Sequence, residues 1–116
     1  MRDVAPLVWS VADGGSPAGT LVIDEVLGKH EMIVYAVALD TQGAIKAIEI
    51  LEYREAYGGQ IRTEAWRKQF VGKRHGAALK LDVDVMNIGG ATLSCKHVLD
   101  GVRRVLALHQ IALKDA

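Results

Sequence analysis

Short apolar runs alternate with glycine-rich polar stretches along the first half of the chain. The first run covers residues 7 to 12 and ends at Asp13-Gly14-Gly15-Ser16-Pro17, whose residue types favour turns. A β-branched run from Gly19 to Leu27 is followed by Gly28-Lys29-His30 and by another apolar run from Glu31 to Leu39. This pattern predicts a strand, a turn and then two strands paired as an antiparallel hairpin.

A further strand is predicted from Ala44 to Tyr53, after the polar turn Asp40-Thr41-Gln42-Gly43. Its apolar residues change phase after Ala47, which is typical of a β-bulge. Alanine, lysine and glutamate are common in this segment, so a helix is the alternative. Read as strands, these consecutive segments predict an antiparallel β-meander.

A short helix is predicted from Ala65 to Val71. Thr63 is a candidate N-cap residue, and Glu64 places a negative charge near the positive end of the helix dipole. Two aromatic residues of this helix, Trp66 and Phe70, are four positions apart and therefore share a face. Packing in the core is favoured for them over stacking on a ligand.

The basic stretch Lys73-Arg74-His75-Gly76, interpreted as a solvated connector, leads to a predicted strand from Ala77 to Val85. From about Ser94 onward, apolar residues recur at the spacing of a long helix: Val98, Val102, Val105, Leu106, His109, Ala112 and Leu113. The expected fold is α+β, an antiparallel β-meander sheet covered by a short helix and a long C-terminal helix. We expect residues 1–116 to form a single domain.

Composition excludes several classes of protein. Half of the 116 residues are apolar, and 14 Lys and Arg residues balance 14 Asp and Glu residues. A chain of this length can bury about two-thirds of its unfolded surface without a disulfide or metal. Zero net charge argues against a nucleic-acid partner. The longest apolar run, Met32 to Leu39, is far shorter than the roughly 20 residues of a membrane-spanning helix.

Candidate chemistry is concentrated in Asn87-Ile88-Gly89-Gly90-Ala91-Thr92-Leu93-Ser94-Cys95, just before the long helix. The beginning of a helix offers unpaired backbone N–H groups and a positive dipole end, which together suit a phosphate. Thr92 adds a hydroxyl that can bond to a phosphate or carry an ester made by another enzyme. The alternative is a plain turn at Gly89-Gly90, with Thr92 or Ser94 as the N-cap residue.

Other reactive side chains in the chain favour structural roles. No histidine base is assigned to Cys95, which favours a small packed residue over a nucleophile. The four histidines lack the spacing of metal ligands, so no metal site is predicted. No catalytic residue is assigned.

The segment Gly90-Ala91-Thr92-Leu93-Ser94-Cys95, continued by Val98-Leu99-Asp100-Gly101-Val102, resembles the signature of the FMN-binding domain family. This family occurs in the C subunit of the sodium-pumping NADH:quinone reductase, in the G subunit of Rnf complexes and in related small redox proteins. In its pattern, Ser/Thr-Gly-Ala-Thr-x-Thr/Ser, the last Thr of Gly-Ala-Thr carries FMN through a phosphoester that a flavin transferase installs. The resemblance therefore implies that Thr92 is the attachment point.

Two further segments resemble the family in order and spacing. Glu55-Ala56-Tyr57-Gly58-Gly59-Gln60-Ile61 is similar to its Glu-Thr-x-Gly-x-Gly loop, which lies near the flavin, and Gln69-Phe70-x-Gly72-Lys73 is similar to its Gln-Phe-x-Gly-Lys motif. The sequence departs from the family at Gly89, usually Ser or Thr, and at Met86, commonly Asp. The FMN-binding residues that the resemblance implies are Tyr57, Gly58, Gly59, Ile61, Gly90, Ala91, Thr92, Leu93 and Ser94.

The resemblance implies an FMN-carrying electron-transfer domain, a redox carrier or subunit of an oxidoreductase system rather than a stand-alone enzyme. The partners it implies are a flavin transferase and a redox partner protein or membrane electron-transport complex. Family members usually follow a leader or membrane anchor, so we expect a periplasmic or other extracytoplasmic location. The N-terminus shows no secretory signal, which favours the cytoplasm as the alternative. The alternative function is a flavin-free sensory or interaction module of the same fold.

Overall fold

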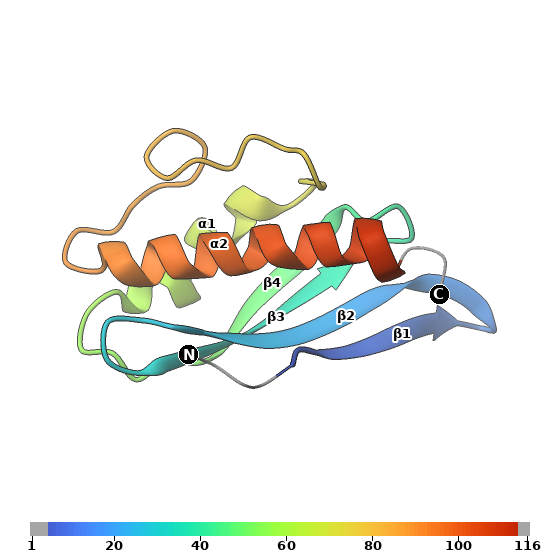
Figure 1. Cartoon of the computed structure of the whole chain (residues 1–116), viewed down its shortest axis with the longest axis horizontal. Helices are drawn as coiled ribbons and strands as arrows, with labels where there is room; N and C mark the ends of the chain where they lie inside the picture. The colour runs from blue at the N-terminus through green and yellow to red at the C-terminus, as the bar shows by residue number, and fades with distance from the viewer. Residues whose placement is uncertain (1–4, 114–116) are drawn as a thin grey trace.

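The computed structural model describes residues 5–113 and contains a four-stranded antiparallel sheet with helices on one face (Figure 1). The strands lie side by side in sequence order: β1 (Leu7–Asp13), β2 (Ser16–Leu27), β3 (Met32–Leu39) and β4 (Ile45–Glu52). The predicted meander and the hairpin between β2 and β3 are confirmed. The segment after Asp40–Gly43 is a strand and not the alternative helix.

The change of phase in β4 comes from a β-bulge, as predicted. Leu39 of β3 pairs with Ile45, and the residue before Leu39 pairs with Ala47, so Lys46 is the extra residue. The bulge places Ile45 and Ile48 on the same buried face although they are three positions apart. One face of β4 therefore stays apolar and buried from Ile45 to Ile50.

Helix α2 (Thr92–Leu108) packs on β2 and β3 and covers this face of the sheet (Figure 1). It begins at Thr92 rather than at about Ser94, and a π-helical turn, η3 (His109–Leu113), continues it. Ala112 is exposed, and the side chain of Leu113 lies outside the described part of the chain. Within residues 5–113 no helix is both long enough and apolar enough to cross a bilayer. The main buried residues are Val22, Val26, Ile33, Tyr35, Val37, Leu39, Ile45, Ile48 and Ile50 from the strands and Cys95, Val98, Leu99, Val102, Val105 and Leu106 from α2.

The segment after β4 folds into three short helical turns. Thr63 caps the second turn as predicted, because its hydroxyl accepts the Trp66 backbone N–H at 3.3 Å. Trp66 and Phe70 are buried and contact each other edge to face, with ring centroids 5.2 Å apart. Arg67 ties the turns to β4 by donating to the Ile48 carbonyl at 2.7 Å. The turns are η1 (Gly59–Arg62), α1 (Glu64–Arg67) and η2 (Lys68–Phe70).

The predicted strand from Ala77 to Val85 is wrong, because this segment is an irregular loop. The Lys80 carbonyl accepts the N–H groups of residues 83 to 85 at 2.8–3.2 Å, so the backbone bonds within the loop. A strand needs a neighbouring sheet edge, whereas this loop lies on the side of α2 away from the sheet (Figure 1). Leu79 and Val85 are buried, so the apolar alternation reflects packing in the core without a strand.

Candidate functional site

Three segments that are distant in sequence meet around the beginning of α2, at one end of the molecule (Figure 1). They are the turn between β2 and β3, the segment after β4 and the residues Gly90–Ser94. They surround a cavity of about 340 Å³, a volume in the range of small-molecule sites. Its lining residues are Lys29, His30, Glu55, Ala56, Tyr57, Gly90, Ala91, Thr92, Leu93 and Ser94, which include six of the predicted site residues.

Thr92 is the first residue of α2 and is exposed on the wall of this cavity. Its Oγ1 accepts a hydrogen bond from the Asn87 side-chain amide at 3.2 Å, which leaves the hydroxyl proton available for another acceptor. The N-cap residue is Ala91, not Thr92 or Ser94. The first N–H groups of an α-helix have no acceptor within the helix, and its dipole favours an anion there. An exposed hydroxyl and a positive helix end therefore lie at the same cavity.

Tyr53 fastens the Tyr57 loop to the beginning of α2. Its hydroxyl donates to the Tyr57 carbonyl and lies 3.3 Å from the hydroxyl oxygen of the buried Ser94. Burial raises the pKa of Tyr53, and the nearby Glu55 carboxylate raises this pKa further. The phenol therefore keeps its proton and its role as a donor at neutral pH.

Three of the predicted site residues do not line the cavity. Gly58 packs against Tyr53 and Ala91, next to the cavity, where a side chain would not fit. Its φ is 90°, and a Cβ at this position would lie 2.4 Å from both the Tyr53 hydroxyl oxygen and the Ala91 Cβ. Gly59 is exposed, with open space where a Cβ would lie. Ile61 is fully buried in the core, because η1 directs its side chain inward. Gly58 therefore shapes the loop behind the cavity, whereas the structure places no such demand on Gly59.

Three charged or titratable cavity residues, Lys29, His30 and Glu55, were not among the predicted site residues. Lys29 and His30 belong to the turn between β2 and β3, and a turn has no hydrophobic periodicity that would mark a binding residue. Only the packing of this hairpin beside α2 brings them to the cavity. Glu55 could have been identified from the sequence, because it is the first residue of the segment that resembles the family loop.

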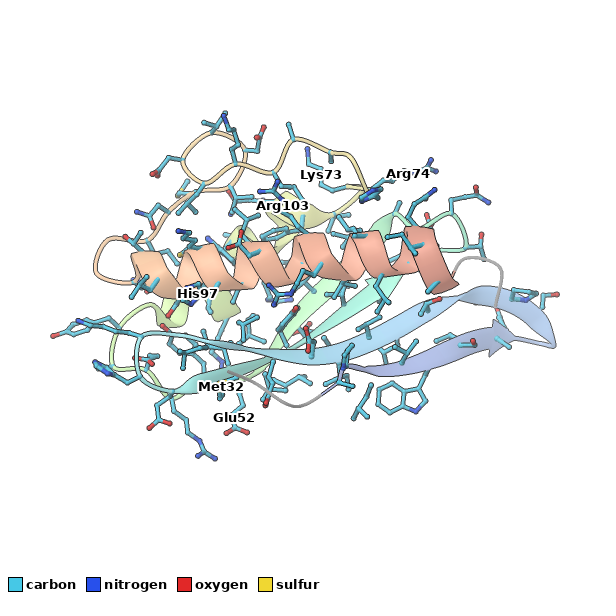
Figure 2. All side chains as sticks on the ribbon, viewed as in Figure 1. Met32, Glu52, Lys73, Arg74, His97 and Arg103 are labelled. Carbon is cyan, nitrogen blue, oxygen red and sulfur yellow. The ribbon has the colours of Figure 1, made fainter. Side chains whose placement is uncertain are left out.

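The basic cluster formed by Lys73, Arg74, His75 and Arg103 lies apart from the cavity. Figure 2 shows Lys73, Arg74 and Arg103 on the loop side of α2, away from the turn between β2 and β3. Arg74, His75 and Arg103 line a separate hollow of about 230 Å³. These cations are therefore not part of the wall around Thr92.

Cys95 lies in the first turn of α2 but faces the core, where it is fully buried. Burial raises the pKa of its thiol. The neutral thiol is therefore the dominant form at neutral pH, and the prediction of a packed residue is confirmed by its position.

We expect Cys95 in the folded protein to resist iodoacetamide at neutral to mildly alkaline pH and to react fully after unfolding in guanidinium chloride. Because burial raises the folded-state pKa of the thiol, its contribution to stability is present below the unfolded pKa. That contribution is lost as the pH rises through the folded pKa. Intact mass after timed labelling at several pH values measures the reaction. Complete labelling of the folded protein at the rate of a free thiol would contradict the burial of Cys95.

Comparison with known proteins places this cavity in context. The crystal structure of Shewanella oneidensis NqrC has a similar fold, with a TM-score of 0.61 and 21% sequence identity. The similarity covers 92% of this chain and 55% of that chain, so this chain spans about half of the NqrC structure. No curated protein matches the sequence. The family model of the FMN-binding domain matches residues 28–107, and this range contains every residue that lines the cavity. The chain therefore belongs to the FMN-binding domain family, whose cofactor is FMN.

Proposed function

We propose that this chain is an electron-transfer domain that holds FMN in the cavity at the beginning of α2, with the FMN phosphate at Thr92. The position of Thr92 carries this proposal. Its hydroxyl is exposed at the positive end of α2 and on the wall of the cavity. Both features suit the phosphate of the family's cofactor.

The residues around the cavity fit FMN. Tyr57 and Leu93 expose 72% and 44% of their surfaces, which provides apolar area for the flat isoalloxazine ring. Gly90 adopts a φ of 82°, and a Cβ there would come no closer than 4.0 Å to a neighbouring atom. The backbone beside Thr92 is therefore open to a phosphate group, while Lys29 adds a positive charge to the wall.

The protein's part in the chemistry is to bind and orient the cofactor. When bound, FMN supplies one-electron and two-electron transfer chemistry, which does not require a general base from the protein. Asn87 orients the Thr92 side chain by donating to its Oγ1. An ester oxygen keeps its lone pairs, so this hydrogen bond is compatible with a phosphoester at Thr92.

The proposal includes covalent attachment of FMN by a flavin transferase. In that reaction the Thr92 Oγ1–phosphorus bond forms while a phosphoanhydride bond of an activated flavin nucleotide breaks. The hydroxyl proton leaves with the aid of the transferase, and the remaining nucleotide departs. The exposure of Thr92 supports access by such an enzyme. Gly89 is also exposed, and the space where its Cβ would lie is open.

The resemblance to the family and the NqrC-like fold support a place in an electron-transport assembly. We propose that the domain exchanges electrons with a redox partner protein or a membrane complex outside the cytoplasm. Tyr57 and Leu93 lie at an open cavity, which would leave an edge of the flavin accessible to such a partner.

Expression of the chain with and without a flavin transferase tests the proposed function. We expect a yellow protein whose flavin absorbance is bleached by dithionite and restored by air. Co-expression with the transferase should make the flavin resistant to acid precipitation and add the mass of an esterified FMN. A colourless protein from both preparations that also fails to take up added FMN would overturn the proposal and favour the flavin-free module.

A further inference from the structure

The turn between β2 and β3 is held in place by a carboxylate from the opposite segment of the cavity wall. Glu55 Oε1 accepts the backbone N–H groups of His30 and Glu31, each at 2.5 Å. The turn itself is closed by the Gly28 N–H, which donates to the Glu31 carbonyl at 2.8 Å. Hydrogen bonds to an ionised acceptor are short and strong, so Glu55 fixes the backbone of this turn.

Gly28 allows Glu55 to approach the turn closely. A Cβ at this position would lie 3.1 Å from Glu55 Cγ and Oε1 and 3.2 Å from the Glu31 carbonyl oxygen. A side chain there would press on the carboxylate that holds the turn. The hydrogen bonds from His30 and Glu31 lower the pKa of Glu55, so Glu55 is ionised at neutral pH.

This turn brings a positive charge to the FMN cavity. Lys29 lies in the turn beside His30, and both line the same cavity as Thr92. The carboxylate among the lining residues, Glu55, accepts hydrogen bonds from the backbone of the turn. Two features of the cavity wall can therefore attract a phosphate. One is the ammonium group of Lys29, and the other is the positive end of the α2 dipole.

We propose that the turn between β2 and β3 recognises the phosphate of FMN. Lys29 favours the phosphorylated flavin over riboflavin, and Glu55 is a positioning residue that holds Lys29 at the cavity. This inference rests on the proposed function, because it requires FMN in this cavity. Charge recognition of this kind acts before any ester has formed, when the phosphate is retained by noncovalent contacts alone.

Noncovalent binding of FMN and riboflavin to protein expressed without a transferase tests the role of Lys29. In Lys29→Met we expect the FMN dissociation constant to rise about tenfold, with the riboflavin constant unchanged within about twofold. Lys46→Met is the matched control, since Lys46 is exposed at the bulge of β4 and does not line the cavity. Flavin fluorescence quenching measures both constants.

The outcomes distinguish this inference from the proposed function. Equal weakening of FMN and riboflavin by Lys29→Met would overturn phosphate recognition, because it would place the contact at the ring. Unchanged FMN binding would overturn it as well. A wild-type protein that binds neither flavin would refute the proposed function and the inference together.

The positioning role of Glu55 is tested on the apoprotein, without flavin. Glu55→Ala should speed hydrogen exchange of the His30 and Glu31 amides about tenfold or more, because both N–H groups lose their acceptor. It should also reproduce the selective loss of FMN affinity, and adding Lys29→Met should then have little further effect. Glu52→Gln, which alters an exposed carboxylate paired with Arg54, is the control. Unchanged exchange of both amides, or full additivity of the two substitutions, would overturn the positioning role.

Discussion

Replacing Thr92 by Ala is expected to remove all denaturation-resistant flavin from protein that has been co-expressed with a flavin transferase. An ester needs a hydroxyl oxygen, and the methyl group of alanine has none. The exposed Thr92 Oγ1 lies at the beginning of α2 and on the cavity wall. Intact mass and in-gel flavin fluorescence after acid precipitation measure the attachment, and we expect no signal above the background of protein expressed without the transferase.

Two hydroxyl variants provide matched controls for this experiment. Thr92→Ser keeps a hydroxyl at the same position and should retain covalent flavin, although the added freedom of serine is expected to slow its modification. Ser94→Ala removes a buried hydroxyl that lies beside Tyr53, so covalent attachment should persist. Covalent flavin in Thr92→Ala at the wild-type level would exclude Thr92 as the acceptor.

Thr92→Ala also distinguishes covalent attachment of FMN from noncovalent binding of FMN in the cavity. Thr92→Ala leaves the beginning of α2, Lys29 and the exposed faces of Tyr57 and Leu93 in place. Weak noncovalent binding of FMN is therefore expected to remain. Such a result would show that the cavity binds the cofactor independently of the ester.

The meander could be predicted because each of its signals is local. Apolar residues mark the strands, Gly14-Gly15 and Gly28 mark turns, and the phase change near Ala47 marks the bulge that Lys46 makes. The segment from Ala77 to Val85 shows the limit of this reasoning. Its alternation suits a strand, but alternation does not reveal whether a sheet edge is available beside it, and that depends on the tertiary structure.

The residues of the candidate site likewise fall into those that the sequence could predict and those that it could not. Thr92 and its neighbours could be predicted because a continuous motif contains them and a helix begins there. Ile61 lies within a matching segment, yet its side chain is directed into the core by η1. Lys29 and His30 could not be predicted, because the packing of the β2–β3 hairpin beside α2 decides that they line the same cavity as Thr92.

Gly101→Ala is expected to destabilise the protein, although the same change in an exposed helix stabilises. Gly101 is buried within α2, and a Cβ there would lie 2.3 Å from the Tyr35 hydroxyl oxygen and 2.8 Å from Val26 Cγ1. The gain in helix propensity is about 1 kcal/mol, whereas overpacking costs about 1–3 kcal/mol. The Tyr35 hydroxyl donates to the buried Asp24 carboxylate at 3.1 Å, which restrains the ring. We expect the free energy of unfolding to fall by up to about 2 kcal/mol, as measured by urea titration.

A double-mutant cycle with Tyr35→Phe identifies the cause of this loss. Tyr35→Phe removes the atom nearest to the added methyl group, so Gly101→Ala should cost less in that background than in the wild type. Gly59→Ala, at an exposed position with open space around it, should change stability little. An equal cost in both backgrounds would show that the clash with Tyr35 is not the cause. Because Gly101 sets how closely α2 lies on the sheet, Gly101→Ala should also shift Thr92 relative to Lys29 and weaken FMN binding.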